Sequence, residues 1–457
     1  MIDPTSSQTS ATAVLDIGKT NVKLVLLDDV GTLLAERRRP NAPLPDGPYP
    51  HHDTEGIWQW LLATLREFAG MAHVAAIVPV THGATAALVD DAGLVLPVPD
   101  YEHEPALPQA AYDAMRPGYA ETRSPRLPAG LNLGRQLAWL AQAQPAAFGH
   151  ARHLLMYPQY WAWRLCGVAA GEVTALGCHT DLWHPGRQQY SSLVETMGWQ
   201  DLLPPLRHAW DTLGPVLPAL AAATGLPAQC RVICGIHDSN ASLLRHLGGD
   251  PPPAVLSTGT WVIAAVPGGR LDGLREEADM LANTSALGQS VPCMRFMGGR
   301  EFAELAGSRP GACHASSLQR LVCSGTYALP GFAGAGGPFA GRPGRILGPA
   351  PVDDAERRAL ATLYVALMSD YCLDALGAGD DVVVEGSFTA NPHFAPLLAA
   401  LRPGRRVAVT DDASGTTCGG WMLAHWGRAP RVQAHIAQPL VLDGLAAYRR
   451  AWLAQLR

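Results

Sequence analysis

The chain has 457 residues, is 48% hydrophobic and carries a formal net charge of −6. This length predicts two domains or two lobes, and the acidic balance excludes the basic footprint of a nucleic-acid-binding protein. The first residues lack the basic and apolar regions of a signal peptide, and no apolar run is long enough to span a bilayer. The nine cysteines are scattered and form no CxxC pair. These features predict a cytoplasmic protein with reduced thiols and no membrane partner.

Two apolar runs flank a polar turn in the segment 14–27, VLDIGKTNVKLVLL. A second strand follows the turn, which argues against a Walker-type loop, because that loop leads from a strand into a helix. We therefore predict a β-hairpin whose turn lies near the terminal phosphates of a nucleotide. Asp16 could hold Mg²⁺ through water beside Gly18 and Thr20. The alternative is that Asp16 is an ordinary turn or cap carboxylate.

Lysine occurs at only two positions, Lys19 and Lys23, although the chain has 34 Lys+Arg. A compact ammonium fits a crowded phosphate site better than a planar guanidinium. Lys19 is therefore a candidate phosphate ligand, and Lys23 is either structural or adds to the local positive field. The alternative is a general bias toward arginine that left two lysines together by chance.

Apolar periodicity predicts regular elements through the first half of the chain. Strands are expected at 32–36, 74–80 and 86–89, and helices at 58–68, 131–142 and 153–166. The strand 74–80 leads to His82 and Gly83, which could border a substrate pocket. The loop that holds Asp100, Tyr101 and Glu102 could hydrogen-bond a polyol. The alternatives are a packed histidine and a solvated loop.

The segment 232–241 predicts an apolar strand, a turn that holds Asp238, and a helix that begins near Ser239. A carboxylate in this position could accept the proton of a substrate hydroxyl during phosphoryl transfer. The alternative is a helix N-cap carboxylate that accepts backbone N–H groups.

A proline run at 251–253 marks the predicted domain boundary. We expect an N-terminal domain at 12–249, a C-terminal domain at 254–430 and a helical segment at 431–457. The segment 254–266 repeats the pattern of the opening hairpin, with a turn at Ser257–Thr260. In that turn Thr258, Gly259 and Thr260 could donate to the transferring phosphate. Gly386 and Asn391 could flank an adenine.

Taken in order, five segments resemble motifs of the FGGY carbohydrate kinases, in the superfamily of sugar kinases, actin and heat-shock chaperone ATPases. They are Asp16-x-Gly18-x-Thr20-x-x-Lys23, Tyr157 to Gly167, Gly235 to Asp238, Ser257 to Trp261, and Glu385 to Ser387 with Asn391. The resemblance covers the chain from about Thr12 to Trp426.

The resemblance implies an α/β fold of two actin-like, ribonuclease H-like ATPase domains with an interdomain cleft, and ATP and Mg²⁺ as cofactors. It implies that Asp238 is the catalytic base, that His237, Asp238 and Gly83 line the sugar site, and that Asp16 and Asp238 face the metal. The expected nucleotide-binding residues are Asp16, Gly18, Lys19, Thr20, Asn21, Lys23, Thr258, Gly259, Thr260, Gly386 and Asn391; the expected substrate-binding residues are His82, Gly83, Asp100, Tyr101, Glu102, His237 and Asp238.

The rhamnulokinase-like His237-Asp238 and the fuculokinase-like Thr20-Asn21 imply a 6-deoxy-ketohexose substrate such as L-rhamnulose or L-fuculose. Lys19 and Ser387 depart from the family pattern, as does the loop 100–102, and these departures leave other ketoses or polyols open, of the ribulose, xylulose or erythritol type. A sugar-independent actin-like ATPase and a non-catalytic sensor are further alternatives. A homodimer is compatible with the sequence.

Overall fold

The computed structural model describes residues 9–308, 311–410, 414–428 and 434–456. The chain forms two compact units. Unit 1 comprises Met1–Arg245, Ala282–Gln289 and Ser414–Pro430, and unit 2 comprises His246–Leu281, Ser290–Ala413 and Arg431–Arg457. The expected boundary between residues 430 and 431 lies outside the described residues. No helix in the described ranges is long and apolar enough to cross a membrane.

Unit 1 is built on a mixed sheet with the strand order β10-β11-β4-β1-β2-β3, in which β12 also pairs with β4. β1 pairs antiparallel with β2 and parallel with β4, so the predicted opening hairpin is confirmed. The strands are β1 (Ser10–Ile17), β2 (Asn21–Asp28), β3 (Leu33–Pro40), β4 (His73–Thr81), β10 (Thr212–Pro215), β11 (Arg231–Ile233) and β12 (Ile236–His237).

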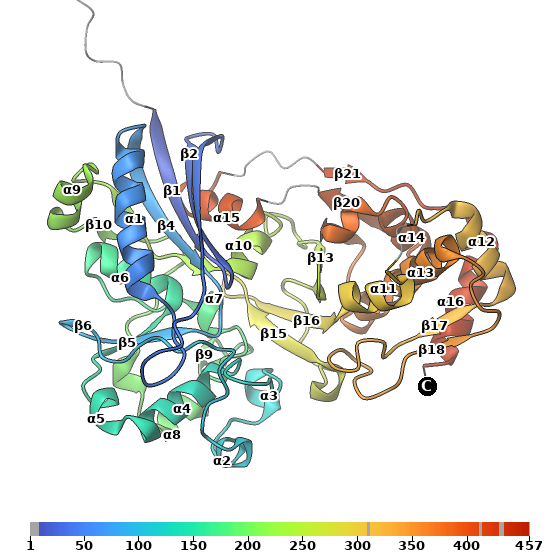
Figure 1. The fold of residues 1–457 in the computed structure, drawn as a ribbon, viewed down its shortest axis with the longest axis horizontal. Coiled ribbons are helices and arrows are strands. Elements are labelled where there is room, and N and C mark those ends of the chain that lie inside the picture. Colours follow the sequence, from blue (N-terminus) through green and yellow to red (C-terminus); the bar gives the residue numbers. More distant parts are fainter. Residues whose placement is uncertain (1–8, 309–310, 411–413, 429–433, 457) are drawn as a thin grey trace, which may run out of the picture. The chain divides into compact units, whose positions relative to one another are not determined.

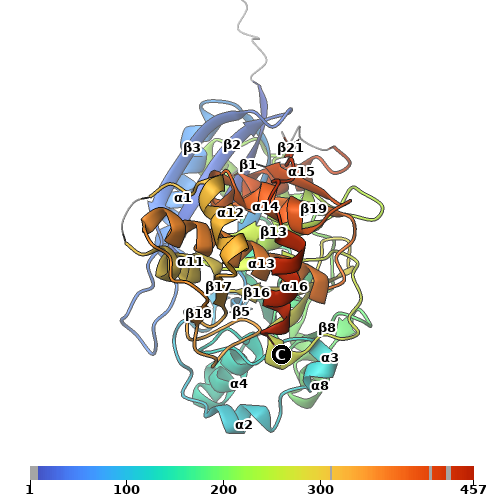
Figure 2. The same cartoon turned by 90° about the vertical axis from the view of Figure 1, so that its right-hand side faces the viewer.

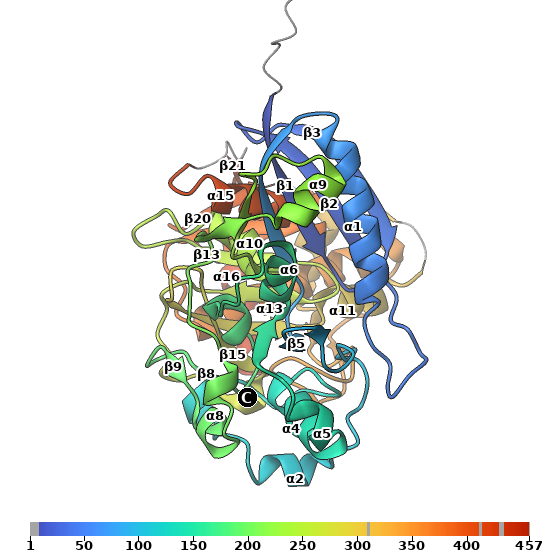
Figure 3. The same ribbon diagram turned by 90° about the vertical axis from the view of Figure 1, so that its left-hand side faces the viewer.

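Helices cover both faces of this sheet (Figures 1 and 3). Successive residues of a strand point to opposite faces, so Leu15 and Ile17 join the core that includes α1 (Thr54–Ala69), α6 (Tyr157–Cys166) and α9 (Pro218–Thr224). The opposite face packs against α15 (Gly415–Ala424), where a Cβ on Gly420 would lie 2.5 Å from Val14 Cγ1. Asp16 shares this second face with Val14.

Glycine lets α15 lie close to α10 (Asp238–Leu244) as well. A Cβ on Gly419 would lie 2.1 Å from the carbonyl oxygen of Ala241, a distance that no side chain could adopt. The small residues of α15 therefore allow the two backbones to approach closely.

A second part of unit 1 contains a three-stranded sheet, β6-β5-β7, and a two-stranded sheet, β8-β9, with their own apolar core. The remaining elements of unit 1 are β5 (Ala86–Asp90), β6 (Gly93–Leu94), α2 (Gln109–Asp113), α3 (Tyr119–Thr122), α4 (Leu133–Ala143), α5 (Pro145–Phe148), β7 (His153–Met156), α7 (Val173–Leu176), β8 (Trp183–His184), β9 (Gln189–Tyr190), α8 (Ser192–Thr196) and η1 (Gln200–Leu202).

The expected helix at 153–166 is wrong for its first four residues. His153–Met156 forms β7 and pairs with β5, which buries Leu154 and Leu155. The helix α6 begins at Tyr157, and its next residue is Pro158, a residue that favours the first turn of a helix. Cross-strand pairing outweighed the helical spacing of the apolar residues here.

Unit 2 repeats the arrangement of unit 1, with the order β15-β16-β14-β13-β19-β20-β21. β13 pairs antiparallel with β14 and parallel with β19, as β1 pairs with β2 and β4. The long helix α13 packs against α11, α12 and α14 (Figure 2). The elements are β13 (Ala254–Thr258), β14 (Val262–Ala265), η2 (Glu276–Ala278), β15 (Met280–Thr284), β16 (Ser290–Phe296), α11 (Gly298–Ala306), α12 (Ala315–Ser324), β17 (Tyr327–Leu329), β18 (Arg345–Leu347), α13 (Asp354–Ala375), β19 (Asp381–Gly386), η3 (Ser387–Ala390), α14 (Phe394–Leu401), β20 (Arg406–Thr410), β21 (Ala434–Ile436) and α16 (Leu445–Ala454).

Candidate active site

Asp16 lies near the end of β1, just before the turn to β2. Its side chain is surrounded by polar groups on the face of the sheet that packs against α15. The register opposes Asp16 to Lys23, and Lys23 Nζ lies 2.8 Å from Asp16 Oδ2. Thr416 Oγ1 donates to the same oxygen over 2.6 Å, from the first turn of α15. The Asp16 side chain is only 6% exposed, so these partners stabilise a carboxylate that would otherwise be costly to bury.

The backbone of the same turn is closed by short contacts. Gly18 N donates to Asn21 O over 3.0 Å, and Asn41 Nδ2 donates to Gly18 O over 2.7 Å. Thr20 is exposed, and its hydroxyl accepts a hydrogen bond from Asn21 Nδ2. The turn therefore presents polar groups next to the buried carboxylate.

Asp16 and the polar groups around it suit an Mg²⁺ ion that is held through water, better than one that is enclosed by protein ligands alone. A carboxylate and hydroxyls are the hard oxygen donors that Mg²⁺ prefers, and Mg²⁺ in nucleotide sites is usually held by one or two carboxylates together with phosphates. No group of three or more His, Cys, Asp or Glu side chains in the described ranges could hold a metal by itself. Asp16 and its hydroxyl neighbours thus fit the expected role.

The candidate base Asp238 is the first residue of α10, one residue earlier than expected. The preceding Gly235 has φ +89°, and a Cβ there would lie 2.5 Å from Pro79 O, so only glycine allows this turn beside β4. Asp238 does not cap the helix: the N-cap residue is His237, and the Asp238 carboxylate accepts from the adjacent Ser239 N.

Burial, together with the negative charge of Asp16, raises the pKa of Asp238 to about 6, against the opposing influence of His82 and Ser239. Its side chain is nevertheless 29% exposed, so a substrate can reach it. A carboxylate with a pKa near 6 is a stronger base than an ordinary aspartate and is still ionised at neutral pH.

His237 lies against this carboxylate in its neutral form. Burial lowers the pKa of His237 to about 4. Asn240 Nδ2 lies 3.4 Å from His237 Nδ1 and, as an amide N–H group, donates to it, which places the ring proton on Nε2. His237 Nε2 lies 3.3 Å from Asp238 Oδ1, so this edge of the ring donates toward the carboxylate.

His82 and Gly83 adjoin the same turn. A Cβ on Gly83 would lie 2.7 Å from His237 Nε2, so glycine is required for the ring to stay in place. His82 Nδ1 donates to Gly83 O over 3.0 Å, and burial lowers the pKa of His82, so its Nε2 is an unprotonated acceptor. His82 Nε2 is buried and has no hydrogen-bond partner among the described residues, which suits a substrate hydroxyl.

Two further residues join this cluster: His52, which the sequence did not single out, and Tyr157, which begins one of the five family motifs but was not expected at the site. The rings of His52 and Tyr157 lie 5.0 and 5.2 Å from the ring of His82, measured between centroids. His52 Nε2 and the Tyr157 hydroxyl are also buried and lack a hydrogen-bond partner in the described part of the chain. Their sequence signal was weak, because a lone histidine and a helix-start tyrosine are common core residues.

A buried carboxyl group, that of Glu172, supports the backbone next to Asp238. Thr174 Oγ1 accepts a hydrogen bond from His237 N over 3.1 Å and donates to Glu172 Oε2 over 2.5 Å. Glu172 is fully buried, and burial raises its pKa to about 7. Two successive hydrogen bonds, from His237 N–H to Thr174 and from the Thr174 hydroxyl to Glu172, thus fix the position of the residue next to Asp238.

On the expectation that Asp238 is a catalytic base, replacing Thr174 by valine should reduce kcat by about 10- to 100-fold, because the buried His237 N–H loses its acceptor and Asp238 loses its fixed position. Nucleotide affinity should stay within twofold of wild type. Steady-state kinetics on Thr174→Val and on Thr174→Ser, which keeps the hydroxyl, checks this. Equal loss in both variants would contradict a role for the hydroxyl.

In unit 2 the second hairpin is tied to the turn after β19. Thr258 pairs with Gly386 across the sheet, and Thr258 Oγ1 donates to Glu385 O and accepts from Phe388 N. This hydroxyl therefore holds the two turns together. Gly259 and the exposed Thr260 form the tip of the hairpin, where Gly299 N donates to Thr260 O.

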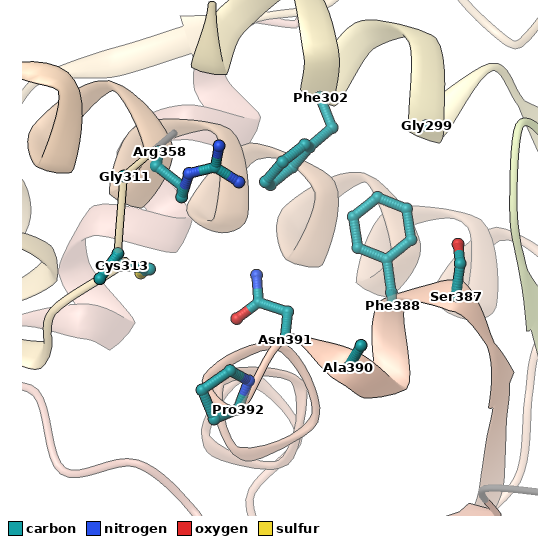
Figure 4. A pocket seen from close by; sticks show the side chains of 11 residues that line it. Gly299, Phe302, Gly311, Cys313, Arg358, Ser387, Phe388, Ala390, Asn391 and Pro392 are labelled. Atoms are coloured by element: carbon teal, nitrogen blue, oxygen red, sulfur yellow. The ribbon is translucent and has the colours of Figure 1, made fainter. Parts of the chain in front are cut away.

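Beside these turns lies a pocket of about 490 Å³, a size that suits a nucleoside. Figure 4 shows Phe302, Phe388 and Asn391 around one space, with the Arg358 side chain near Phe302. The Phe302 and Phe388 rings meet edge to face with centroids 5.4 Å apart. The lining residues are Gly299, Phe302, Gly311, Ala312, Cys313, Arg358, Ser387, Phe388, Ala390, Asn391 and Pro392.

Of the two residues expected at the adenine, Asn391 lines this pocket, with its side chain tied to Thr362 Oγ1 and His393 N. Gly386 lies outside the lining and shapes the turn instead. It has φ +90°, and a Cβ there would lie 2.0 Å from Thr258 O.

Solved structures share this fold over nearly the whole chain. A carbohydrate kinase from Novosphingobium aromaticivorans is 37% identical, with a TM-score of 0.91 over 98% of this chain and 99% of that one. The xylulose kinase from Rhodospirillum rubrum has a TM-score of 0.80 over 97% and 98% of the chains, at 19% identity, and so supports the fold alone. The fold is that of the sugar kinases, with two actin-like ATPase domains.

The sequence itself matches the same class of protein. Residues 123–245 match the N-terminal domain of the FGGY family of carbohydrate kinases, and residues 250–432 match the C-terminal domain, Carbohydrate kinase FGGY. The chain therefore belongs to the FGGY family of carbohydrate kinases. It is 26% identical over 270 residues to L-fuculokinase of Escherichia coli (strain K12), an alignment that spans 57% of each chain.

Proposed function

We propose that this protein transfers the γ-phosphate of MgATP to a hydroxyl of a ketose, with Asp238 as the base. The observation that carries this proposal is the position of Asp238 at the start of α10. There its raised pKa and partial exposure combine with an acceptor, His82, that has no partner among the described residues. An aspartate of this kind can accept the proton of a sugar hydroxyl as that oxygen attacks phosphorus.

The other residues divide between the two ligands. His82, His237 and the loop of Asp100, Tyr101 and Glu102 would bind sugar hydroxyls, and Gly83 gives His237 its room. In unit 1, Asp16 with Gly18, Thr20, Asn21 and Lys23 would serve the nucleotide phosphates. When bound, Mg²⁺ would neutralise phosphate charge, held through water by Asp16 and with Asp238 nearby.

In unit 2 the pocket with Asn391 would hold the adenosine, and the tip at Gly259 and Thr260 would donate to phosphate. Phe302 and Phe388 give this pocket an aromatic, apolar lining against which a purine could pack. Thr258 and Gly386 would act through the shape of this turn, because both are engaged with each other.

For the sugar we propose a 6-deoxy-ketohexose of the L-fuculose or L-rhamnulose type. Support comes from the likeness to L-fuculokinases of E. coli and of Salmonella typhi, the latter 28% identical over 275 residues. The likeness to xylulose kinases concerns the fold alone. Other ketoses therefore belong in the same test.

The test is a coupled assay of ADP release with L-rhamnulose, L-fuculose, L-ribulose and D-xylulose. A kinase releases ADP many times faster with its sugar than without it. An ATPase of the same fold would release ADP at a rate that none of the sugars changes, and that result would contradict the proposal.

The acid limb of the pH profile should report the raised pKa of Asp238. The base must be ionised, so kcat/KM for the sugar should be constant above about pH 7 and should fall tenfold per pH unit below about pH 6. The measurement keeps MgATP saturating at each pH, which removes the effect of nucleotide titration on binding. A limb centred near pH 4 would show that the site leaves this aspartate unperturbed.

A further inference from the structure

The two lysines of the opening turn serve different carboxylates. Lys23 Nζ pairs with Asp16, as described above. Lys19 Nζ forms an ion pair with Asp100 Oδ1, lies 3.2 Å from Glu102 Oε2 and sits 4.6 Å from the centroid of the Tyr101 ring. Lys19 thus contacts all three residues of the loop 100–102.

The contacts of Lys19 with this loop are partly buried, so the attraction between its charge and the Asp100 carboxylate is only weakly screened by water. The side chain of Lys19 is 20% exposed and that of Asp100 is 7% exposed. A carboxylate this deeply placed is costly without a cation, and an ammonium over an aromatic ring gains a further attraction. Lys19 therefore stabilises the conformation of the loop.

The loop in turn reaches the cluster around the base. Its backbone is anchored by Asp100 N to Pro50 O and by Gly130 N to Tyr101 O. The Tyr101 ring meets the His82 ring at a centroid distance of 5.4 Å. Contacts therefore run from Lys19 through Tyr101 to His82, the acceptor next to the catalytic turn.

We propose that Lys19 is a specificity-determining residue on the sugar side of the site, which positions the loop 100–102, and that it is not a ligand of the nucleotide phosphates. This inference rests on the proposed kinase function. Asp100 and Glu102 share the single ammonium group of Lys19. Carboxylate oxygens of the loop therefore remain as acceptors for the hydroxyl groups of an uncharged sugar. The charge of Lys19 also adds to the effect of burial in lowering the pKa of His52 and His82, which favours neutral acceptor rings.

The first measurement is calorimetric binding of MgATP to wild type and Lys19→Ala, which requires no sugar. The proposal predicts equal Kd values within twofold, whereas Lys23→Ala weakens binding. A tenfold or larger loss of MgATP affinity in Lys19→Ala overturns the proposal. Lys19→Met, which keeps the aliphatic stem over Tyr101, replaces the alanine variant if the latter does not fold.

The second measurement is KM for the ketose of the panel with the highest wild-type kcat/KM. Lys19→Ala should raise this KM about tenfold, because displacement of the loop misplaces its hydroxyl acceptors. Asp100→Asn should raise it similarly, and the double variant should be no worse than either single variant, since the two groups act as one unit. An unchanged KM, or additive effects, overturns the proposal.

Arg37→Ala is the matched control. It removes an ion pair with Glu67, between β3 and α1, where both side chains are 42% exposed, and it should leave both constants unchanged. If the wild-type enzyme showed no sugar-stimulated ADP release, the proposed kinase function itself would be refuted. The MgATP measurement would then still decide whether Lys19 is a phosphate ligand.

Discussion

Replacing Asp238 by asparagine should lower kcat by about 10³-fold and, at the same time, make the protein more stable at pH 8. The loss of rate follows because the amide cannot accept the proton of the sugar hydroxyl. Binding of MgATP should remain, since Asp238 contacts His237 and Ser239 and is not among the residues that line the pocket proposed for adenosine. Full turnover in Asp238→Asn would exclude this residue as the base.

The gain in stability follows from the direction of the pKa shift. The folded protein raises the pKa of Asp238 from 3.8 to about 6, so the ionised carboxylate destabilises the folded state relative to the unfolded state. This penalty is fully present above about pH 6 and absent below about pH 4. Asparagine removes it, so the free energy of unfolding should rise by about 1 to 2 kcal/mol at pH 8.

Thermal unfolding of wild type and Asp238→Asn at pH 8 and at pH 4 measures this difference. The variant should unfold at a Tm about 2 to 4 °C higher at pH 8, and the two proteins should converge at pH 4. A lower Tm for the variant at pH 8 would mean that the Asp238 carboxylate is held favourably and would contradict its raised pKa.

Replacing Asp16 by asparagine should reduce kcat by about 10²- to 10³-fold, the usual cost of removing one group that stabilises transferring charge. The amide keeps the shape and can accept from Thr416, but it gives Mg²⁺ no negative charge and leaves Lys23 without its carboxylate. The Mg²⁺ concentration for half-maximal rate should rise about tenfold or more, because the negative charge that holds the ion through water is lost.

A titration of kcat against MgCl₂ at fixed ATP checks this prediction. Asp28→Asn is the matched control on the same hairpin: its carboxylate accepts from Val30 N and Thr32 N, an arrangement that asparagine can reproduce. The control should behave as wild type. An Asp16→Asn enzyme with wild-type Mg²⁺ dependence would remove Asp16 from the metal site.

Local patterns predicted the frame of unit 1 and of its site well. The two apolar runs around Gly18 predicted the β1–β2 hairpin, because two short apolar runs and the polar turn between them are encoded within a few residues. The strand before Asp238 and the helix after it likewise predicted that this carboxylate lies at the start of a helix, as it does in α10. The repetition of the hairpin at Ser257–Thr260 is matched by the same strand pairing in unit 2.

Contacts between residues far apart in sequence were beyond such patterns. Thr416 donates to Asp16 across 400 positions, and Thr174 supports His237 across 63. The orientation of the Lys19 side chain likewise depends on a partner far away in the sequence, Asp100. A residue in a turn has no register that fixes its side chain, so its partner is set by the loop that folds against it.

The central claim is that Asp238 catalyses phosphoryl transfer to a sugar, and ³¹P NMR of the reaction mixture tests it most directly. With MgATP and the best ketose of the panel, wild type should form ADP and a sugar phosphate ester in equal amounts. Asp238→Asn, which should still bind MgATP, should form neither above background. ADP with inorganic phosphate in place of the ester, or undiminished ester from the variant, would contradict the account.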